Sequence, residues 1–256
     1  MKAPSPSVDS VQVMTSMLAI EVRCEVASVD DTDRFAGLTV EYCATTARES
    51  GCVRCDLIRS EGSPCAFSLL EVYEDETAQT EHQGTPHYAA WRREAVAPLL
   101  SGGDGIAALK RPVVPAEVTA WRYPRGMTAV PLHAGDARGE AHGPLVLVFS
   151  CYVENGSSIE FARECATFSL SALGEPGVAR MDVLQSLMDP SAFTLIICFH
   201  NVDAQAALWS SPQYVDWCNK VEQFVLNGAL GPGEQWRGLF PRQSHHWDSY
   251  SGIMVT

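Results

Sequence analysis

The chain has 256 residues, of which 46% are apolar and 19% are charged, which is ordinary for a soluble globular protein. Its net charge of −13 argues against a nucleic-acid backbone or an anionic membrane as partner. No segment approaches the ~18 consecutive apolar residues of a membrane-spanning helix. The length suits one large domain or two of about 100 to 130 residues.

The first 17 residues lack the basic region and apolar run of a secretory signal, so we expect a disordered leader there. Nine cysteines follow, several of them within apolar runs, where a free thiol packs as a small hydrophobe. Cys52 and Cys55 form a CxxC in a strand-like run, and no second CxxC or nearby His pair completes a zinc site. We therefore expect buried, reduced cysteines and a cytoplasmic or other reducing intracellular compartment.

The chain contains an internal repeat. The segment GCVRCD at residue 51 matches GVARMD at residue 177, a spacing of 126 residues. Without a gap, the same spacing pairs Arg54 with Arg180 and Trp91 with Trp217. About one position in three is identical in this run, against about one in 17 expected by chance. Further upstream, the same frame pairs Val22 with Val148 and Phe35 with Phe161. We infer a tandem duplication.

In chain order, each copy predicts a strand (18–27; 145–153), a helix (31–49; 157–173) and two strands (52–59 and 65–73; 178–185 and 192–199). Gly51 and Gly177 are predicted to end the first helix. A second helix starts near residues 75 and 203, and Thr85-Pro86 and Ser211-Pro212 restart it with a capping hydroxyl before proline. A last strand is expected near 116–123 and 234–240, around the two Trp-Arg pairs.

The order β-α-β-β-α-β is the ferredoxin-like arrangement, with helices on one face of an antiparallel sheet. Because the bare face must be buried, two such units can pack sheet to sheet within one chain. We therefore predict an α+β fold of tandem ferredoxin-like units forming an intramolecular pseudo-dimeric α+β barrel. The predicted parts are a leader (1–17), a first domain (18–125), a linker (126–143), a second domain (144–241) and a tail (242–256).

Three motifs in the first copy carry a family resemblance: GCVRCDL at residue 51, LEVYEDE at residue 70, and His82 followed by Pro86-His87-Tyr88. Together they resemble the antibiotic biosynthesis monooxygenase family of the dimeric α+β barrel superfamily. The resemblance implies a small single unit that dimerises. It also implies cofactor-independent monooxygenases of quinols and polycyclic aromatics, an isomerase, or heme-degrading enzymes. In the heme-degrading branch, a tryptophan would stand at His82 and the heme-ligating histidine at Arg92, so heme degradation is a minor alternative.

The first copy differs from the second at chemically active positions. Alternate residues of a strand share a face, and the apolar row that ends at Ile197 and Phe199 becomes Glu71 and Tyr73 in the first copy. A carboxyl on that face would be desolvated, which raises its pKa toward the range of a general base. The alternative is that Glu71 points the other way and pairs with Arg54 or another cation.

On the second helix, His82 and His87 replace Leu208 and Gln213 of the second copy. His82 could approach Glu71 and form a carboxylate–imidazole pair for proton transfer; the alternative is an ordinary surface or core histidine. Tyr88 and Trp91 occur in both copies and are expected to form core or pocket wall. Arg54 and Asp56, with their matches Arg180 and Asp182, are expected to be structural pairs.

These residues predict a small-molecule enzyme whose active unit is the first domain. Glu71 or His82 would take a proton from an aromatic or conjugated substrate, with or without O₂ addition, and Tyr73, His87, Tyr88 and Trp91 would orient it. We expect no cofactor and no metal, with heme as a lesser possibility. The expected partner is a small-molecule substrate, with no nucleic acid or membrane, and the protein would be a monomeric pseudo-dimer or a homodimer. The alternatives are a non-catalytic ligand-binding or interaction protein and a heme-degrading monooxygenase.

Overall fold

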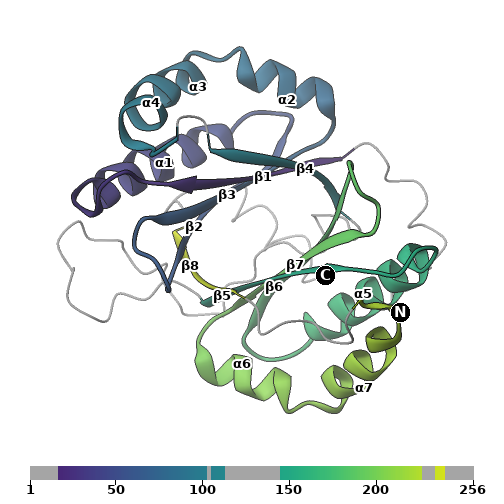
Figure 1. The fold of residues 1–256 in the computed structure, drawn as a ribbon. Helices are drawn as coiled ribbons and strands as arrows, with labels where there is room; N and C mark the ends of the chain where they lie inside the picture. Colours follow the sequence, from purple (N-terminus) through teal and green to yellow (C-terminus); the bar gives the residue numbers. More distant parts are fainter. Residues whose placement is uncertain (1–16, 103–104, 113–144, 227–233, 240–256) are drawn as a thin grey trace, which may run out of the picture.

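The computed structural model describes residues 17–102, 105–112, 145–226 and 234–239 (Figure 1). The predicted linker and tail, and all but the last residue of the predicted leader, lie outside these ranges. We call residues 18–112 unit one and residues 145–239 unit two.

The predicted order of strands and helices is confirmed in both units. Unit one contains β1 (Leu18–Glu25), α1 (Thr32–Thr46), β2 (Cys52–Ser60), β3 (Ala66–Tyr73), α2 (Glu76–Gln83), α3 (Pro86–Trp91), a π-helical turn (Arg92–Val96), α4 (Ala97–Leu99) and β4 (Ile106–Pro112). Unit two contains β5 (Leu145–Tyr152), α5 (Ser158–Ala172), β6 (Val178–Ser186), β7 (Ala192–Phe199), α6 (Val202–Trp209), α7 (Pro212–Val221) and β8 (Glu234–Leu239). Short 3-10 turns lie at Val29–Asp31 and Glu222–Phe224.

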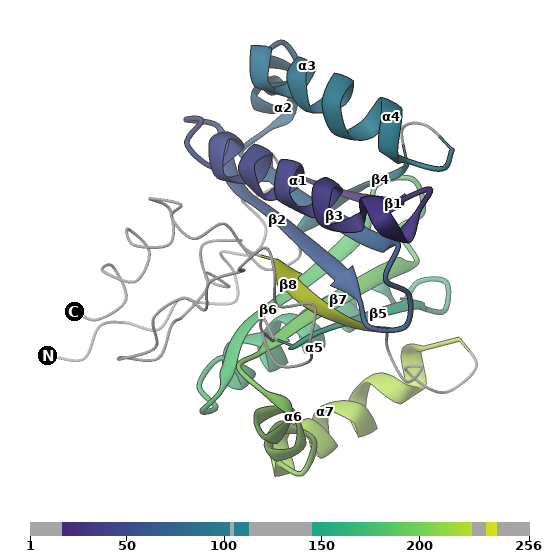
Figure 2. The ribbon, with the colours of Figure 1, turned by 90° about the vertical axis from the view of Figure 1, so that its left-hand side faces the viewer.

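The eight strands close into one barrel, in the order β1-β3-β2-β8-β5-β7-β6-β4. The last strand of each unit joins the two sheets, because β4 pairs with β1 and with β6, and β8 pairs with β5 and with β2. Helices α1 to α4 cover one side of the barrel and α5 to α7 the opposite side (Figures 1 and 2). The predicted pseudo-dimeric α+β barrel within one chain is therefore confirmed.

The predicted capping hydroxyl before a proline, which restarts the second helix in each unit, is also confirmed. The side chain of Thr85 accepts a hydrogen bond from the backbone N–H of Tyr88, and Ser211 does the same for Tyr214. Each hydroxyl satisfies an otherwise free donor at the start of a helix, and the proline that follows has no N–H to lose.

The predicted last strand of unit one is wrong in position. The strand that pairs with β1 is β4, which begins at Ile106, soon after α4 ends at Leu99. The prediction relied on the match between Trp121-Arg122 and Trp236-Arg237, whereas the short connection after α4 is enough to bring the chain back beside β1. The predicted range 116–123 lies outside the described residues.

The gapless frame of the repeat is wrong in the first strand. Val22 lies opposite Leu69, whereas Val148 lies opposite Ile196, the match of Leu70. The structural counterpart of Val22 is Phe149, one residue further along. Unit one has one extra residue between its first strand and its first helix, and a shift by one residue exchanges the two faces of a strand.

Gly51 and Gly177 do not end the first helix, which stops at Thr46 in unit one and at Ala172 in unit two. They allow a close approach between chain segments instead. A Cβ atom at Gly51 would lie 2.3 Å from the Cβ of Ala78, and one at Gly177 would lie 2.4 Å from the Cβ of Ala204. Each glycine therefore lets the start of a strand lie against the start of the second helix.

Inside the barrel, ion pairs cross between the units. Arg54 binds Asp182 at 2.6 Å, and Arg180 binds both Asp56 and Asp182. All four residues are buried. The sequence predicted structural arginine–aspartate pairs, and the structure exchanges the partners between the two copies. The pairs thus connect the sheets of the two units.

Each unit has its own apolar core between sheet and helices, and a third apolar cluster lies between the two sheets. None of the nine cysteines, all within the described residues, forms a disulfide; seven are buried and two, Cys65 and Cys218, are half-buried. The CxxC lies within β2, as its strand-like sequence predicts. No helix of the described residues has the length and apolar character needed to cross a bilayer.

Candidate functional site

Glu71 lies on β3 in the row Phe67, Leu69, Glu71 and Tyr73, which faces the helices of unit one. Phe67, Leu69 and Tyr73 belong to the apolar core of that unit. Glu71 is only 6% exposed. Arg54 lies in the barrel interior with Asp182, so the alternative pairing of Glu71 with Arg54 is not found. Instead, the Glu71 carboxylate meets a tyrosine of α1.

Five side chains of unit one form a continuous series of polar contacts that starts at Glu71, with hydrogen bonds from Glu71 to Glu49 and an ion-pair contact from Glu49 to His87. The Tyr42 hydroxyl donates to Glu71 Oε1 at 2.5 Å, and His82 Nε2 lies 2.7 Å from the same Tyr42 oxygen. His82 Nδ1 lies 3.0 and 3.2 Å from the two carboxylate oxygens of Glu49. His87 Nε2 lies 2.9 Å from Glu49 Oε1. We call this series, Glu71–Tyr42–His82–Glu49–His87, the polar chain.

The polar chain runs from the core to the surface. Glu71, Tyr42 and His82 are buried. The side chains of Glu49 and His87 are 22% and 25% exposed. A group that arrives from solvent therefore meets Glu49 and His87 first, and the buried part of the chain lies behind them.

Burial shifts the proton affinities of these groups. It raises the pKa of Glu71 to about 7, although the hydroxyls of Tyr42 and Tyr73 oppose the rise. It lowers the pKa of His82 to about 4. Burial also raises the pKa of Glu49, which His87 opposes, and raises the pKa of Tyr42, which the Glu71 charge raises further. A carboxyl that titrates near neutrality can exchange a proton at physiological pH.

Aromatic rings enclose the polar chain. Trp91 stacks on Tyr42 with centroids 4.3 Å apart, and its indole N–H donates to Thr39 at 3.1 Å. Tyr88 contacts the His82 ring edge-on at 5.2 Å, and Tyr73 of β3 lies 5.4 Å from it. Trp91 and Tyr88 thus pack against the polar chain.

The structure brings together Glu71, Tyr73, His82 and His87, the four residues predicted to be catalytic, and adds two that sequence reasoning missed. Tyr42 links Glu71 to His82, and Glu49 links His82 to His87. A signal for Tyr42 was available, because the same repeat spacing matches it with Phe168. Glu49 gave no such signal, because its match, Glu175, is identical.

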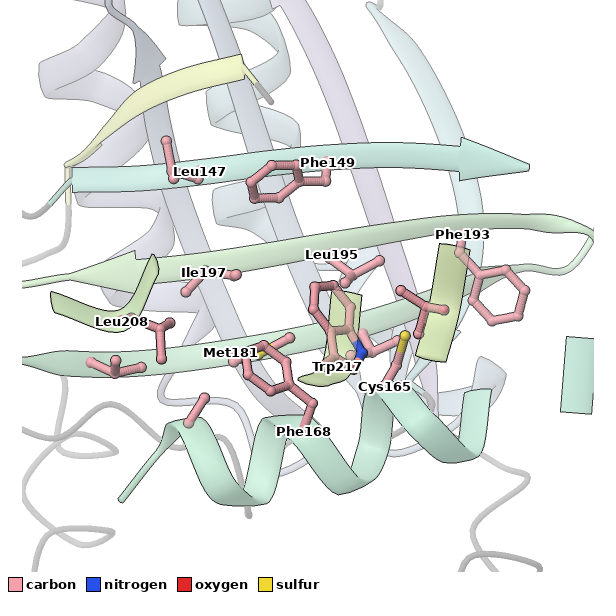
Figure 3. Packing of buried hydrophobic residues seen from close by; sticks show 14 of the residues in the cluster. Leu147, Phe149, Cys165, Phe168, Met181, Phe193, Leu195, Ile197, Leu208 and Trp217 are labelled. Carbon is pink, nitrogen blue, oxygen red and sulfur yellow. The ribbon is translucent and has the colours of Figure 1, made fainter. Parts of the chain in front are cut away.

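Unit two has the same architecture without the polar chain. Phe168 stacks on Trp217 at 4.5 Å, as Tyr42 does on Trp91. Figure 3 shows Ile197 and Leu208 within the apolar core, at the positions that match Glu71 and His82. Gln213 donates to Glu175 at 2.5 Å, where unit one has the contact between His87 and Glu49. At the positions of the polar chain, unit two therefore has only the Glu175 carboxylate and the Gln213 amide as polar groups.

The comparisons with known proteins agree with this picture. Residues 17–94 match the model of the antibiotic biosynthesis monooxygenase family. This range holds all five members of the polar chain.

Three solved structures cover nearly the whole chain. Candidate monooxygenases from Fusobacterium nucleatum and Lactobacillus acidophilus are each 13% identical, with a TM-score of 0.69. Each comparison covers 88% of this chain, and 93% and 94% of the other chains, respectively. An anthrone oxidase-like protein is 9% identical, with a TM-score of 0.54 over 87% of this chain and 91% of that chain. At these identities the likeness shows the fold. Residues 17–94 of this protein are therefore a domain of the antibiotic biosynthesis monooxygenase family, followed in the same chain by a second unit of the same fold.

Proposed function

We propose that unit one is a small-molecule enzyme that removes a proton from an aromatic or conjugated substrate and passes it along the polar chain. The observation that carries the proposal is the polar chain itself, which joins a buried carboxyl to two partly exposed groups. The family of the domain supports a monooxygenase-like role. Unit two has the same fold without the chain, so the architecture does not require these polar residues.

The hydrogen-bond geometry defines a state that is ready to accept a proton. With Glu71 ionised, Tyr42 donates to Glu71 and His82 Nε2–H donates to Tyr42. A neutral imidazole has a single N–H. His82 Nδ1 then presents a lone pair to the Glu49 carboxylate at 3.0 Å, so that two acceptors face each other.

One added proton relieves this contact. A proton taken from substrate at Glu49 moves to His82 Nδ1, the Nε2 proton moves to the Tyr42 oxygen, and the Tyr42 proton moves to Glu71. Each hydrogen bond then has one donor and one acceptor, and Glu71 is a neutral carboxylic acid. His87, at the exposed end beside Glu49, is placed to orient the substrate.

The fate of the substrate anion determines the product. A carbanion conjugated with an aromatic ring can reduce O₂ and form a hydroperoxide at the same carbon. Loss of water then leaves a carbonyl, so that one oxygen atom enters the product and the other leaves as water. Return of the proton to a different carbon gives an isomer instead. Neither outcome requires a cofactor, because the substrate supplies the electrons.

The test is O₂ consumption by chelator-treated protein with a panel of quinols and polyphenols. Glu71→Gln should lower kcat by about 10²- to 10⁴-fold, the usual contribution of a general base. Glu175→Gln, which makes the same change at the carboxyl that unit two retains, is the control and should leave kcat unchanged. Circular dichroism would check that both variants fold.

Three results would contradict parts of the proposal. Turnover that survives in the double variant Glu71→Gln/His82→Leu would exclude proton transfer along the polar chain from Glu49 to Glu71. Conversion of a substrate to an isomer without O₂ uptake would keep proton abstraction and exclude oxygenation. Ligands that bind and are never converted would favour a non-catalytic binding protein.

A further inference from the structure

A cluster of three metal-binding side chains lies at the exposed end of the polar chain. Ligand atoms of Glu49, His82 and His87 all lie within 4.8 Å of one another. We propose that these three residues bind a divalent transition-metal ion such as Zn²⁺ or Co²⁺. This proposal goes beyond the proposed function and does not depend on it, because the ion would take the place of the proton that the relay puts on His82 Nδ1.

The hydrogen-bond partners of His82 favour a cation at its Nδ1 atom. Its Nε2 atom is occupied by Tyr42, whose hydroxyl proton is engaged by Glu71. Donation from Nε2 to the tyrosine leaves a lone pair on Nδ1, directed at the Glu49 carboxylate. An ion bound to both Nδ1 and Glu49 removes the conflict between these two acceptors, and it needs no added proton.

The spacing between the Glu49 carboxylate and each of the two imidazoles suits one ion. The Glu49 oxygens lie 3.0 Å from His82 Nδ1 and 2.9 Å from His87 Nε2. Two atoms that are each about 2.1 Å from an ion lie about 3 Å apart when the angle between them is roughly 90°. Since Glu49 and His87 are partly exposed, an ion can enter from solvent, and water can fill its remaining positions.

The surroundings resemble the support that metal-binding histidines have in proteins. Such a histidine usually donates its other ring N–H to an oxygen acceptor, which fixes the orientation of the ring. Here Tyr42 and then Glu71 supply that support to His82, and Trp91 packs flat against Tyr42. The imidazole ligand is therefore held in place before any ion arrives.

The chemistry of the ligands selects the class of ion. Imidazole nitrogen suits zinc, copper, iron and nickel, whereas magnesium and calcium prefer oxygen ligands. Two imidazoles and one carboxylate therefore predict a transition-metal ion. In unit two, Leu208 and Gln213 replace the histidines, so Glu175 is left without either imidazole.

The experiment titrates the chelator-treated full-length protein with Co²⁺ and with Zn²⁺, and measures heat by calorimetry and, for Co²⁺, visible absorption. We expect one ion per chain and a rise in Tm with ion concentration. His87→Gln, which installs the residue of unit two, should weaken binding at least tenfold, and His82→Leu should abolish it. Mg²⁺ should give no binding heat at the same concentrations.

Three controls separate this site from other metal-binding groups. Glu175→Gln tests unit two, a variant lacking both His245 and His246 tests the adjacent histidines near the end of the chain, and Cys65→Ser/Cys218→Ser tests the two half-buried thiols. All three should bind one ion with unchanged affinity. No stoichiometric binding to wild type, or unchanged binding in Glu49→Gln/His87→Gln, would overturn the proposal. Because the titration contains no substrate, its outcome is independent of whether the protein consumes O₂.

Discussion

Unit one and unit two use the same backbone for different interiors. In unit two, Phe168, Ile197 and Leu208 belong to an apolar layer between sheet and helices. In unit one, the matched positions hold Tyr42, Glu71 and His82, and each is hydrogen-bonded within the layer. The stacks of Tyr42 on Trp91 and Phe168 on Trp217 have nearly the same geometry.

The comparison shows that this fold accommodates either polar or apolar side chains at these positions without a change of backbone architecture. Burial of a polar group is costly unless a partner accompanies it. Unit one meets this condition because its polar residues occur as a connected set rather than singly. A single exchange between the units should therefore be destabilising in either direction.

The largest effect on stability is expected from the ion pairs that join the units, because the two matched aspartates differ in the number of arginines that they bind. Asp182 binds both Arg54 and Arg180, whereas its match Asp56 binds Arg180 through one oxygen, and the other oxygen has no hydrogen-bond partner among the described residues. Asp182→Asn leaves buried arginine charge uncompensated and should cost about 3 to 5 kcal/mol of unfolding free energy. Asp56→Asn should cost less. Urea unfolding of the two variants would measure the difference, and equal losses would contradict it.

The second prediction concerns the pH dependence of stability and compares Glu71 with Glu74, an exposed carboxyl nearby in the sequence. The pKa of Glu71 is about 7 in the folded protein, above its ordinary value of 4.5. At the Glu71 carboxyl the folded state therefore holds more proton than the unfolded chain between these pH values, so the contribution of Glu71 to stability is greatest below about pH 4.5 and falls as pH rises toward 7. The loss that this carboxyl causes should be about 3 kcal/mol.

Urea unfolding at pH 5 and pH 8 would test this prediction. Glu71→Gln should remove most of the loss, because the amide does not ionise. Glu74→Gln, which changes an exposed carboxyl three residues further along, should keep the pH dependence of wild type. If Glu71 is the base, turnover should rise with pH through about 7, so activity and stability would change in opposite directions. A Glu71→Gln variant with the pH dependence of wild type would contradict the assignment.

The smallest expected effect exchanges one hydroxyl between the units. Tyr42→Phe installs the residue of unit two, keeps the stack on Trp91, and removes the hydroxyl between Glu71 and His82. It should cost about 1 to 2 kcal/mol of unfolding free energy, the cost of leaving buried polar groups without a partner. Phe168→Tyr should also destabilise, because the match of Glu71 is Ile197.

A double-mutant cycle with Glu71→Gln would sharpen this comparison. Tyr42→Phe and Glu71→Gln should not be additive, since both remove the same hydrogen bond. Additive losses in the cycle would mean that Tyr42 and Glu71 do not interact.

The sequence alone determined the repeat, the order of strands and helices, and the difference between the copies at Glu71, His82 and His87. These depend on local signals: side-chain periodicity, capping hydroxyls before proline, and identity at a constant spacing. They were sufficient for the barrel as well, because a sheet with helices on one face must bury the other.

Only the tertiary structure decided which residues meet. Tyr42 joins Glu71 to His82, and Glu49 joins His82 to His87, across sequence separations that no local pattern encodes. The one-residue shift of the first strand and the position of β4 depend on pairing between strands, and a match in sequence misplaced both. The exchange of partners between Arg54–Asp182 and Arg180–Asp56 likewise requires the two sheets to face each other. Hydrogen bonds and ion pairs depend on distance in space, and the closed barrel sets those distances.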